Sequence, residues 1–163
     1  MHILIKNNYL IFGNYRIKCA VGKRGIGKKK KEGDFITPIG SFKIKFLLYR
    51  KDRIKKLKTE LKAIPIQKDM GWCNDPASIM YNKLVNVPFK FSYEKLFRKN
   101  NVYDLVAVLN YNTNPIKKNK GSAIFLHIAK KNYANTAGCV AIKKTKLLKI
   151  LEKITKNSKV QII

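Results

Sequence analysis

The chain carries its apolar residues in short runs that are separated by glycine, asparagine and proline. The pairs Asn7-Asn8 and Gly13-Asn14 divide the first of these runs, and such pairs are typical of tight β-turns. Short runs rich in β-branched and aromatic residues favour strands over helices. We expect strands over residues 2–5, 9–12, 15–21, 42–49, 103–109, 122–128 and 160–163. The sequence therefore predicts a mostly β fold that begins with a meander.

Helical periodicity is clear in one segment near the C-terminus. Over residues 143–156 leucine and isoleucine recur at helical spacing with lysines between them, which predicts an amphipathic helix. Ser92 is a candidate N-cap, so residues 92–97 are expected to begin a short helical turn. Residues 50–62 fit a loop or a short helix equally well. The three prolines of residues 63–92 predict an irregular but ordered excursion.

Size and composition predict one folded domain over residues 1–163. The 163 residues are 45% hydrophobic and 10% aromatic, which is enough apolar material for a core. No stretch approaches the roughly 20 apolar residues of a membrane span, and Lys6 and Asn7 interrupt the N-terminal apolar run before a signal peptide could form. We therefore expect the cytoplasm, or the cell envelope or periplasm if export uses a segment outside this sequence or an unrecognised route.

Charge is strongly unbalanced, with 36 Lys and Arg against 9 Asp and Glu and a formal net charge of +27. Such a field attracts polyanions, among them nucleic acid, anionic lipid and acidic polymers of a cell envelope. Chains rich in Lys, Asn and Ile are also typical of AT-rich genomes. The charge by itself therefore does not specify a partner.

The cysteine inventory argues against a metal site and against a disulfide framework. Cys19, Cys73 and Cys139 form no C-x-x-C pair, their number is odd, and His2 and His127 lie far apart in the sequence. We expect no metal and no organic cofactor. We interpret Cys19 and Cys73 as packed, structural thiols.

Residues 22–34 combine glycine and lysine and are expected to form an exposed loop. Gly22, Gly27 and Lys28 fit the phosphate-binding pattern G-x-x-x-x-G-K-[ST], but Lys29 stands where a Ser or Thr would bind magnesium. A nucleotide site is therefore not predicted here.

Cys139 is the candidate nucleophile because it directly follows Gly138 at the exit of a loop and the start of an apolar run. Backbone amides of Gly138 and Cys139 would then point at the same place as the sulfur, which is the geometry of an oxyanion hole. His127 ends the preceding apolar run, so a strand, loop and strand would bring its imidazole beside the thiol as a base. A buried structural cysteine and a core histidine would give the same pattern.

Several motifs in order resemble the L,D-transpeptidase family, also called the YkuD family. The segment GSAIFLHIAKKNYANTAGCVAI, residues 121–142, resembles its catalytic region with an upstream His and a Ser/Thr-x-Gly-Cys nucleophile motif. Residues 31–42 are similar to the family signature K-E-G-D…T-P-x-G-x-F, and residues 71–82 to the G-W-C-D-D-P…Y-N stretch of one bacterial branch. The similarity covers nearly the whole chain.

This resemblance implies a β-sandwich with a small number of short helices and a cysteine acyltransferase acting on peptidoglycan stem tetrapeptides. In such a reaction the thiolate releases D-alanine, and the acyl-enzyme forms a 3→3 cross-link with another stem. By the resemblance, Cys139 is the nucleophile, His127 the base and then the acid, and Gly138 an oxyanion donor. The substrate-binding residues that it implies are Thr136, Ala137, Trp72, Asp75, Tyr81 and Asn82.

The sequence departs from the family pattern at two positions close to Cys139. Ala137 stands where a second His is common, and Ala141 where an Arg usually follows the nucleophile. Losing that Arg removes a contact to a substrate carboxylate. Arg50, Arg53 or the lysines of the glycine-rich loop are candidate replacements.

Two alternatives remain open at this stage. The first is an L,D-carboxypeptidase, in which water takes the acyl group from the same acyl-enzyme. The second is a non-enzymatic basic β-domain that binds nucleic acid or envelope polyanions through exposed aromatics and lysines. In the enzymatic readings the partners are peptidoglycan stem peptides, with electrostatic retention on anionic envelope polymers.

Overall fold

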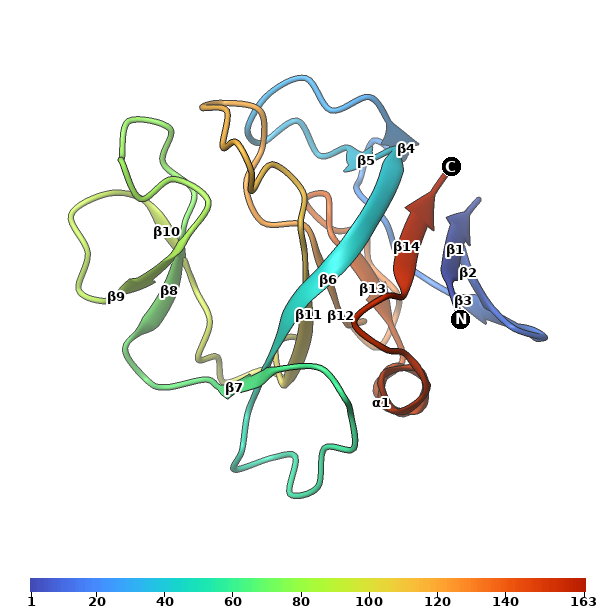
Figure 1. Ribbon diagram of the computed structural model, residues 1–163. Helices are drawn as coiled ribbons and strands as arrows, with labels where there is room; N and C mark the ends of the chain where they lie inside the picture. The colour runs from blue at the N-terminus through green and yellow to red at the C-terminus, as the bar shows by residue number, and fades with distance from the viewer.

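A computed structural model describes residues 1–163, and its main feature is a mixed nine-stranded sheet (Figure 1). Along the sheet, the strands are β13 (Val140–Ile142), β12 (Phe125–Ile128), β11 (Leu105–Leu109), β6 (Gly40–Tyr49), β14 (Lys159–Ile162), β1 (Ile3–Lys6), β2 (Tyr9–Phe12) and β3 (Tyr15–Lys18), with β7 (Ala63–Pro65) paired to β6. β12 pairs in parallel with β13, and β1 with β14, whereas β6 pairs antiparallel with β11 and β14.

The main sheet nearly closes on itself and is barrel-like. Ala20, just beyond β3, forms an isolated bridge with Ala141 of β13, and each amide donates to the other carbonyl at 2.8 and 2.9 Å. The two ends of the sheet are therefore tied together. The predicted mostly β fold is confirmed, and the expected meander is formed by β1, β2 and β3.

The interior of the main sheet holds the larger hydrophobic core. Alternate residues of the strands point inward, for example Leu105 and Ala107 of β11 and Leu126 of β12. Helix α1 (Lys144–Lys153) packs Leu147 and Leu151 into the same core and exposes lysines on its other side. The predicted amphipathic helix is therefore confirmed, but it begins one residue later and ends three residues earlier than its sequence pattern.

A second, smaller core covers the outer face of β6, β11 and β12. It holds Leu48, Val106 and Phe125 from the main sheet and Trp72 from a three-stranded sheet in the order β10 (Tyr93–Lys95), β8 (Met70–Cys73) and β9 (Leu84–Asn86). Figure 1 shows this small sheet set apart from the main one. Cys139 belongs to this second core.

The structure differs from the sequence predictions in the middle of the chain. Residues 93–95 form strand β10 instead of a helical turn, because their backbone pairs with Cys73, Trp72 and Gly71 of β8. The excursion over residues 63–92 contains strands β7, β8 and β9, and residues 50–62 form turns and loop. A last pair, β4 (Ile26–Gly27) with β5 (Thr37–Pro38), closes the base of the glycine-rich loop.

Candidate active site

Cys139 and His127 line the same cavity, which has a volume of about 510 Å³. The parallel pairing of β12 and β13 sets His127 opposite Ala141 and Leu126 opposite Val140. Since side chains alternate along a strand, His127 faces away from the main core, as Cys139 does. The expected strand, loop and strand arrangement thus brings both residues to one cavity of a size usual for ligand sites.

The Cys139 thiol is 9% exposed and has two protein hydrogen-bond partners. Its Sγ accepts from the Phe125 amide at 3.3 Å and donates to the Ala123 carbonyl at 3.6 Å. Burial raises the pKa of this thiol to about 12, and Glu94 adds to the rise, whereas Lys29 and Arg98 oppose it. The resting cysteine is therefore a neutral thiol at physiological pH.

His127 is 6% exposed and is held from two sides. Its Nδ1 lies 3.0 Å from the Ile128 carbonyl, an acceptor, so that nitrogen carries the proton and Nε2 keeps its lone pair. The Tyr103 ring packs edge-on against the imidazole at 5.3 Å between centroids. Burial lowers the pKa of His127 to about 4, so the ring is neutral and able to accept a proton.

The turn before Cys139 is tightly built around Gly138. Gly138 has φ +140°, and a Cβ at this position would lie 2.9 Å from the Ile36 carbonyl oxygen. The Thr136 hydroxyl accepts from the Gly138 amide at 3.1 Å and donates to the Cys139 carbonyl at 2.6 Å. The Gly138 amide is thus engaged inside the turn, while the Cys139 amide makes no hydrogen bond within the protein. Of the two expected oxyanion donors, the Cys139 amide is the free one.

The predicted substrate-binding residues fall into two groups. Thr136 and Ala137 line the cavity. Trp72, Asp75, Tyr81 and Asn82 do not, and three of these four side chains are buried. Direct contact of those four with substrate stays a prediction.

The buried residues of that second group support the walls of the cavity instead. The Trp72 indole packs edge-on against Phe125 and donates to the Asn82 amide oxygen at 3.0 Å. The Tyr81 hydroxyl donates to Glu32, which lines the cavity, and accepts from the Gly121 amide at 3.0 Å.

Lys29, one of the lysines of the glycine-rich loop named as candidate replacements for the missing Arg, lines the cavity. Glu94, Arg98 and Tyr103 also line it and were not among the site residues expected from the sequence. Glu94 Oε1 accepts from the Tyr103 hydroxyl at 2.6 Å and from Arg98 at 3.1 Å, and the Arg98 guanidinium lies 4.5 Å from the centre of the Tyr103 ring. Glu94 and Arg98 lie four residues apart, and this spacing of opposite charges is the sequence feature that could have indicated their ion pair. These three side chains form a connected polar cluster beside His127.

The proposed replacements Arg50 and Arg53 lie outside the cavity. Arg50 is paired with Asp52 and donates to the Arg98 carbonyl, and Arg53 is paired with Asp104. Both guanidinium groups are thus occupied in holding loops together. Arg98, Lys95 and Lys130 are the cations that line the cavity with Lys29.

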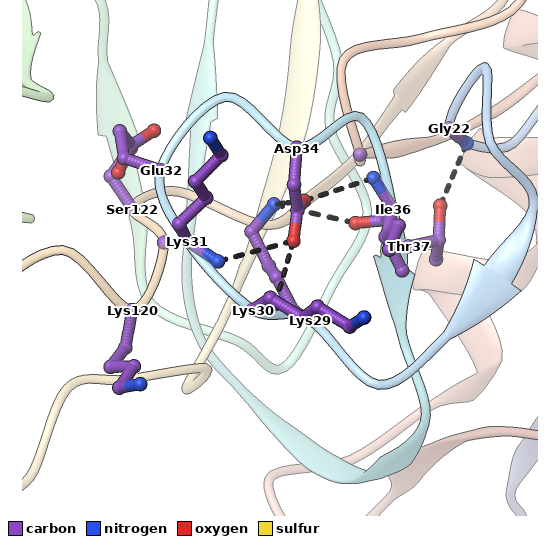
Figure 2. A network of polar contacts seen from close by, with 12 residues as sticks. Gly22, Lys29, Lys30, Lys31, Glu32, Asp34, Ile36, Thr37, Lys120 and Ser122 are labelled. Atoms are coloured by element: carbon purple, nitrogen blue, oxygen red, sulfur yellow. Dashed lines mark hydrogen bonds and ion pairs between the residues drawn. The ribbon is translucent and has the colours of Figure 1, made fainter.

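The glycine-rich loop is less exposed than its composition predicts. The Lys29 and Asp34 side chains, 5% and 3% exposed, form an ion pair of 2.6 Å. Figure 2 shows the Asp34 carboxylate at the centre of this network, where it also accepts from the amides of Lys30, Lys31 and Ile36. Burial alone would raise the pKa of Asp34, but these donors outweigh it and lower the pKa to about 2. The loop is therefore a folded wall of the cavity.

A cysteine and a neutral histidine that line one cavity on a mostly β fold fit the class of cysteine-dependent acyl-transfer enzymes. Residues 3–162 match the family model of the YkuD L,D-transpeptidase catalytic domain, so the chain belongs to this family. It is thus an enzyme family member whose function relates to peptidoglycan. A comparison with curated proteins finds no significant match. None of the helices is long and apolar enough to cross a membrane.

Proposed function

We propose that this enzyme is an L,D-transpeptidase that uses Cys139 to take the acyl group of a peptidoglycan stem tetrapeptide. The observation that carries the proposal is that Cys139 and His127 line one cavity in a chain of this family. The products would be D-alanine and a 3→3 cross-link between stems. A basic domain without enzymatic activity would need neither residue in a common cavity.

The neutral state of both groups sets the order of proton and bond transfers. As Cys139 Sγ attacks the carbonyl carbon, Nε2 of His127 takes the thiol proton, the C–S bond forms, and the carbonyl π electrons move onto oxygen. When the tetrahedral intermediate collapses, the C–N bond to D-alanine breaks and the imidazolium gives its proton to the leaving amine. The Cys139 amide is the donor best suited to the oxygen anion.

The second half of the reaction reverses these steps with a new nucleophile. The side-chain amine of another stem attacks the thioester, a C–N bond forms, and the C–S bond breaks. His127 takes the proton from that amine and returns it to Sγ. Water in place of the amine would give the carboxypeptidase product, a tripeptide.

The charges of the cavity support a substrate with several carboxylates. Arg98, Lys95 and Lys130 line it, and Ala141 leaves space where family members commonly carry an Arg. We propose that Arg98 takes over the carboxylate contact, since its guanidinium uses one bond to Glu94 and one to the Lys95 carbonyl. We further propose that the enzyme works in the cell envelope, where its +27 charge favours retention on anionic polymers.

The test is mass spectrometry of disaccharide-tetrapeptides incubated with the protein, with Cys139→Ala and His127→Ala as matched variants. We expect 3→3 dimers with the unmodified protein, no product with Cys139→Ala, and at least a hundredfold less with His127→Ala. Tripeptides in place of dimers would assign water as the acceptor. Equal product from Cys139→Ala, or no product and no adduct on Cys139 in the parent, would refute the acyl-enzyme.

A further inference from the structure

Lys29 occupies a slot beside the active-site turn that Gly121 keeps open. A Cβ on Gly121, where φ is +100°, would lie 2.3 Å from Lys29 Cε, and a Cβ on Gly138 would lie 3.6 Å from Lys29 Nζ. A real Cβ at Gly121 would therefore overlap the lysine stem. The slot is shaped for this side chain, and it leads the ammonium to the turn that carries Cys139.

The ammonium is fixed there by acceptors on one side. Lys29 Nζ donates to Asp34 Oδ1 at 2.6 Å and to the Ile36 carbonyl at 3.4 Å. Asp34 is itself held by three backbone amides of its own loop, as Figure 2 shows. An ammonium has three N–H donors, so two of them are used in this frame and a third is left over. Lys29 is thus a preorganised cation at the cavity wall.

The proposed mechanism develops negative charge on the Cys139 sulfur in a buried site, and a fixed cation at this place stabilises that charge. Burial holds the pKa of Cys139 near 12 and that of His127 near 4, so the ion pair of thiolate and imidazolium is strongly disfavoured in the resting protein. Glu94 disfavours the thiolate further, whereas Lys29 favours it. In a buried site a cation acts on such charges more strongly than in water.

Resting on the proposed function, we propose that Lys29 is a positioning residue whose fixed charge stabilises the Cys139 thiolate and the oxygen anion that forms beside Gly138. Asp34 orients the ammonium, and Gly121 leaves room for the lysine stem. Lys29, which stands where the phosphate-binding pattern requires Ser or Thr, thus acts in acyl transfer in this proposal.

The test measures the thiol directly and needs no substrate. The rate at which iodoacetamide alkylates Cys139 is followed from pH 6 to 10, with the site identified by peptide mass spectrometry. Lys29→Gln keeps a hydrogen-bond donor for Asp34 but removes the charge, and Lys29→Met removes both. We expect both variants to react about tenfold more slowly at each pH, which corresponds to a displacement of the profile by about one unit.

Lys30→Gln is the matched control, because Lys30 is exposed and bonds Asp34 through its backbone amide, with no ion pair from its side chain. It removes the same charge from the neighbouring position and is expected to leave the profile unchanged. A structural role alone would loosen the site and make Cys139 react faster. Unchanged or faster alkylation in a folded Lys29 variant overturns the proposal, and so does failure of both variants to fold.

The result is distinguishable from failure of the proposed function. A displaced profile in Lys29→Gln, together with no product from tetrapeptides, would keep the role of Lys29 and reject the substrate. Cross-linked product with an undisplaced profile would keep the transpeptidase and reject the role of Lys29.

Discussion

At the scale of single residues, the site depends on keeping two titratable side chains neutral. His127 shows the energetic cost of this most clearly, because its buried ring has a pKa of about 4 where an unperturbed histidine has about 6.5. On unfolding the ring is released to water and binds a proton at any pH between those values. Stability is therefore coupled to pH through this residue.

We predict that the free energy of unfolding falls by about 3 kcal/mol as the pH drops from 6.5 to 4. In that window the unfolded chain binds a proton at residue 127 and the folded protein does not, so lowering the pH favours unfolding. Above pH 6.5 and below pH 4 His127 contributes no slope. Urea denaturation at several pH values measures this.

His127→Gln is the matched variant, because glutamine does not titrate. Its stability is expected to lack that part of the slope, while the loss below pH 4 from Asp34, whose folded pKa of about 2 is depressed, remains. An identical slope in parent and variant would contradict the burial of a neutral His127.

The candidate nucleophile and base could be predicted from sequence because Gly138-Cys139 and His127 lie on neighbouring segments of one local motif. Arg98 could not, since it reaches the cavity from a segment remote in the sequence, and Lys29 could be named only as one of several lysines of the glycine-rich loop. A run rich in glycine and lysine has the composition of an exposed loop, so it predicts an exposed Lys29. Its burial depends on Asp34 and on Gly121, and the contact with Gly121 spans more than half of the chain.

At the scale of elements, the small sheet of β8, β9 and β10 forms one wall of the second core. Residues 92–97 carry a helix-start signal in Ser92, but pairing with β8 overrides that local preference. Trp72 fits a cleft wall or a core position by sequence alone, and only the packing of β8 on β12 makes it a core residue. The sequence pattern does not show which strands pair in the folded protein, so neither feature could be predicted from it.

We predict that Trp72→Ala destabilises the protein by about 3–5 kcal/mol, the usual cost of deleting a large buried aromatic side chain. It removes the edge contact to Phe125 and the hydrogen bond to Asn82. Because the Phe125 amide holds Cys139 Sγ, activity should fall as well. Denaturant unfolding and product formation measure the two effects.

Trp72→Phe is the control, since it keeps an aromatic ring against Phe125 and loses the indole donor. We expect about 1–2 kcal/mol for this change. A Trp72→Ala variant as stable as the parent would show that β8 is not packed on the main sheet as described.

At the scale of the whole molecule, the net charge of +27 far exceeds what the active site uses. Four cations line the cavity, and most other lysines are exposed. Exposed charge of one sign acts over a Debye length of about 10 Å at 0.1 M salt and is screened beyond it. We therefore expect the exposed positive charge to act in association with large anionic surfaces.

We predict that sedimentation of the protein with purified peptidoglycan sacculi weakens at least tenfold between 50 and 300 mM NaCl, because screening removes the long-range attraction. Cys139→Ala should sediment like the parent, since it leaves the surface charge unchanged. Weak binding that is insensitive to salt would show that the charge has no part in retention.

The position of β14 has a consequence for the edges of the main sheet. The last strand of the described chain lies between β6 and β1, not at an edge of the sheet. Without Lys159–Ile162, β1 and β6 would each present an unpaired edge. The bridge from Ala20 to Ala141 closes the ring at its other seam. Removing this strand would expose two strand edges at which other chains can pair, so β14 protects the protein from edge-to-edge aggregation.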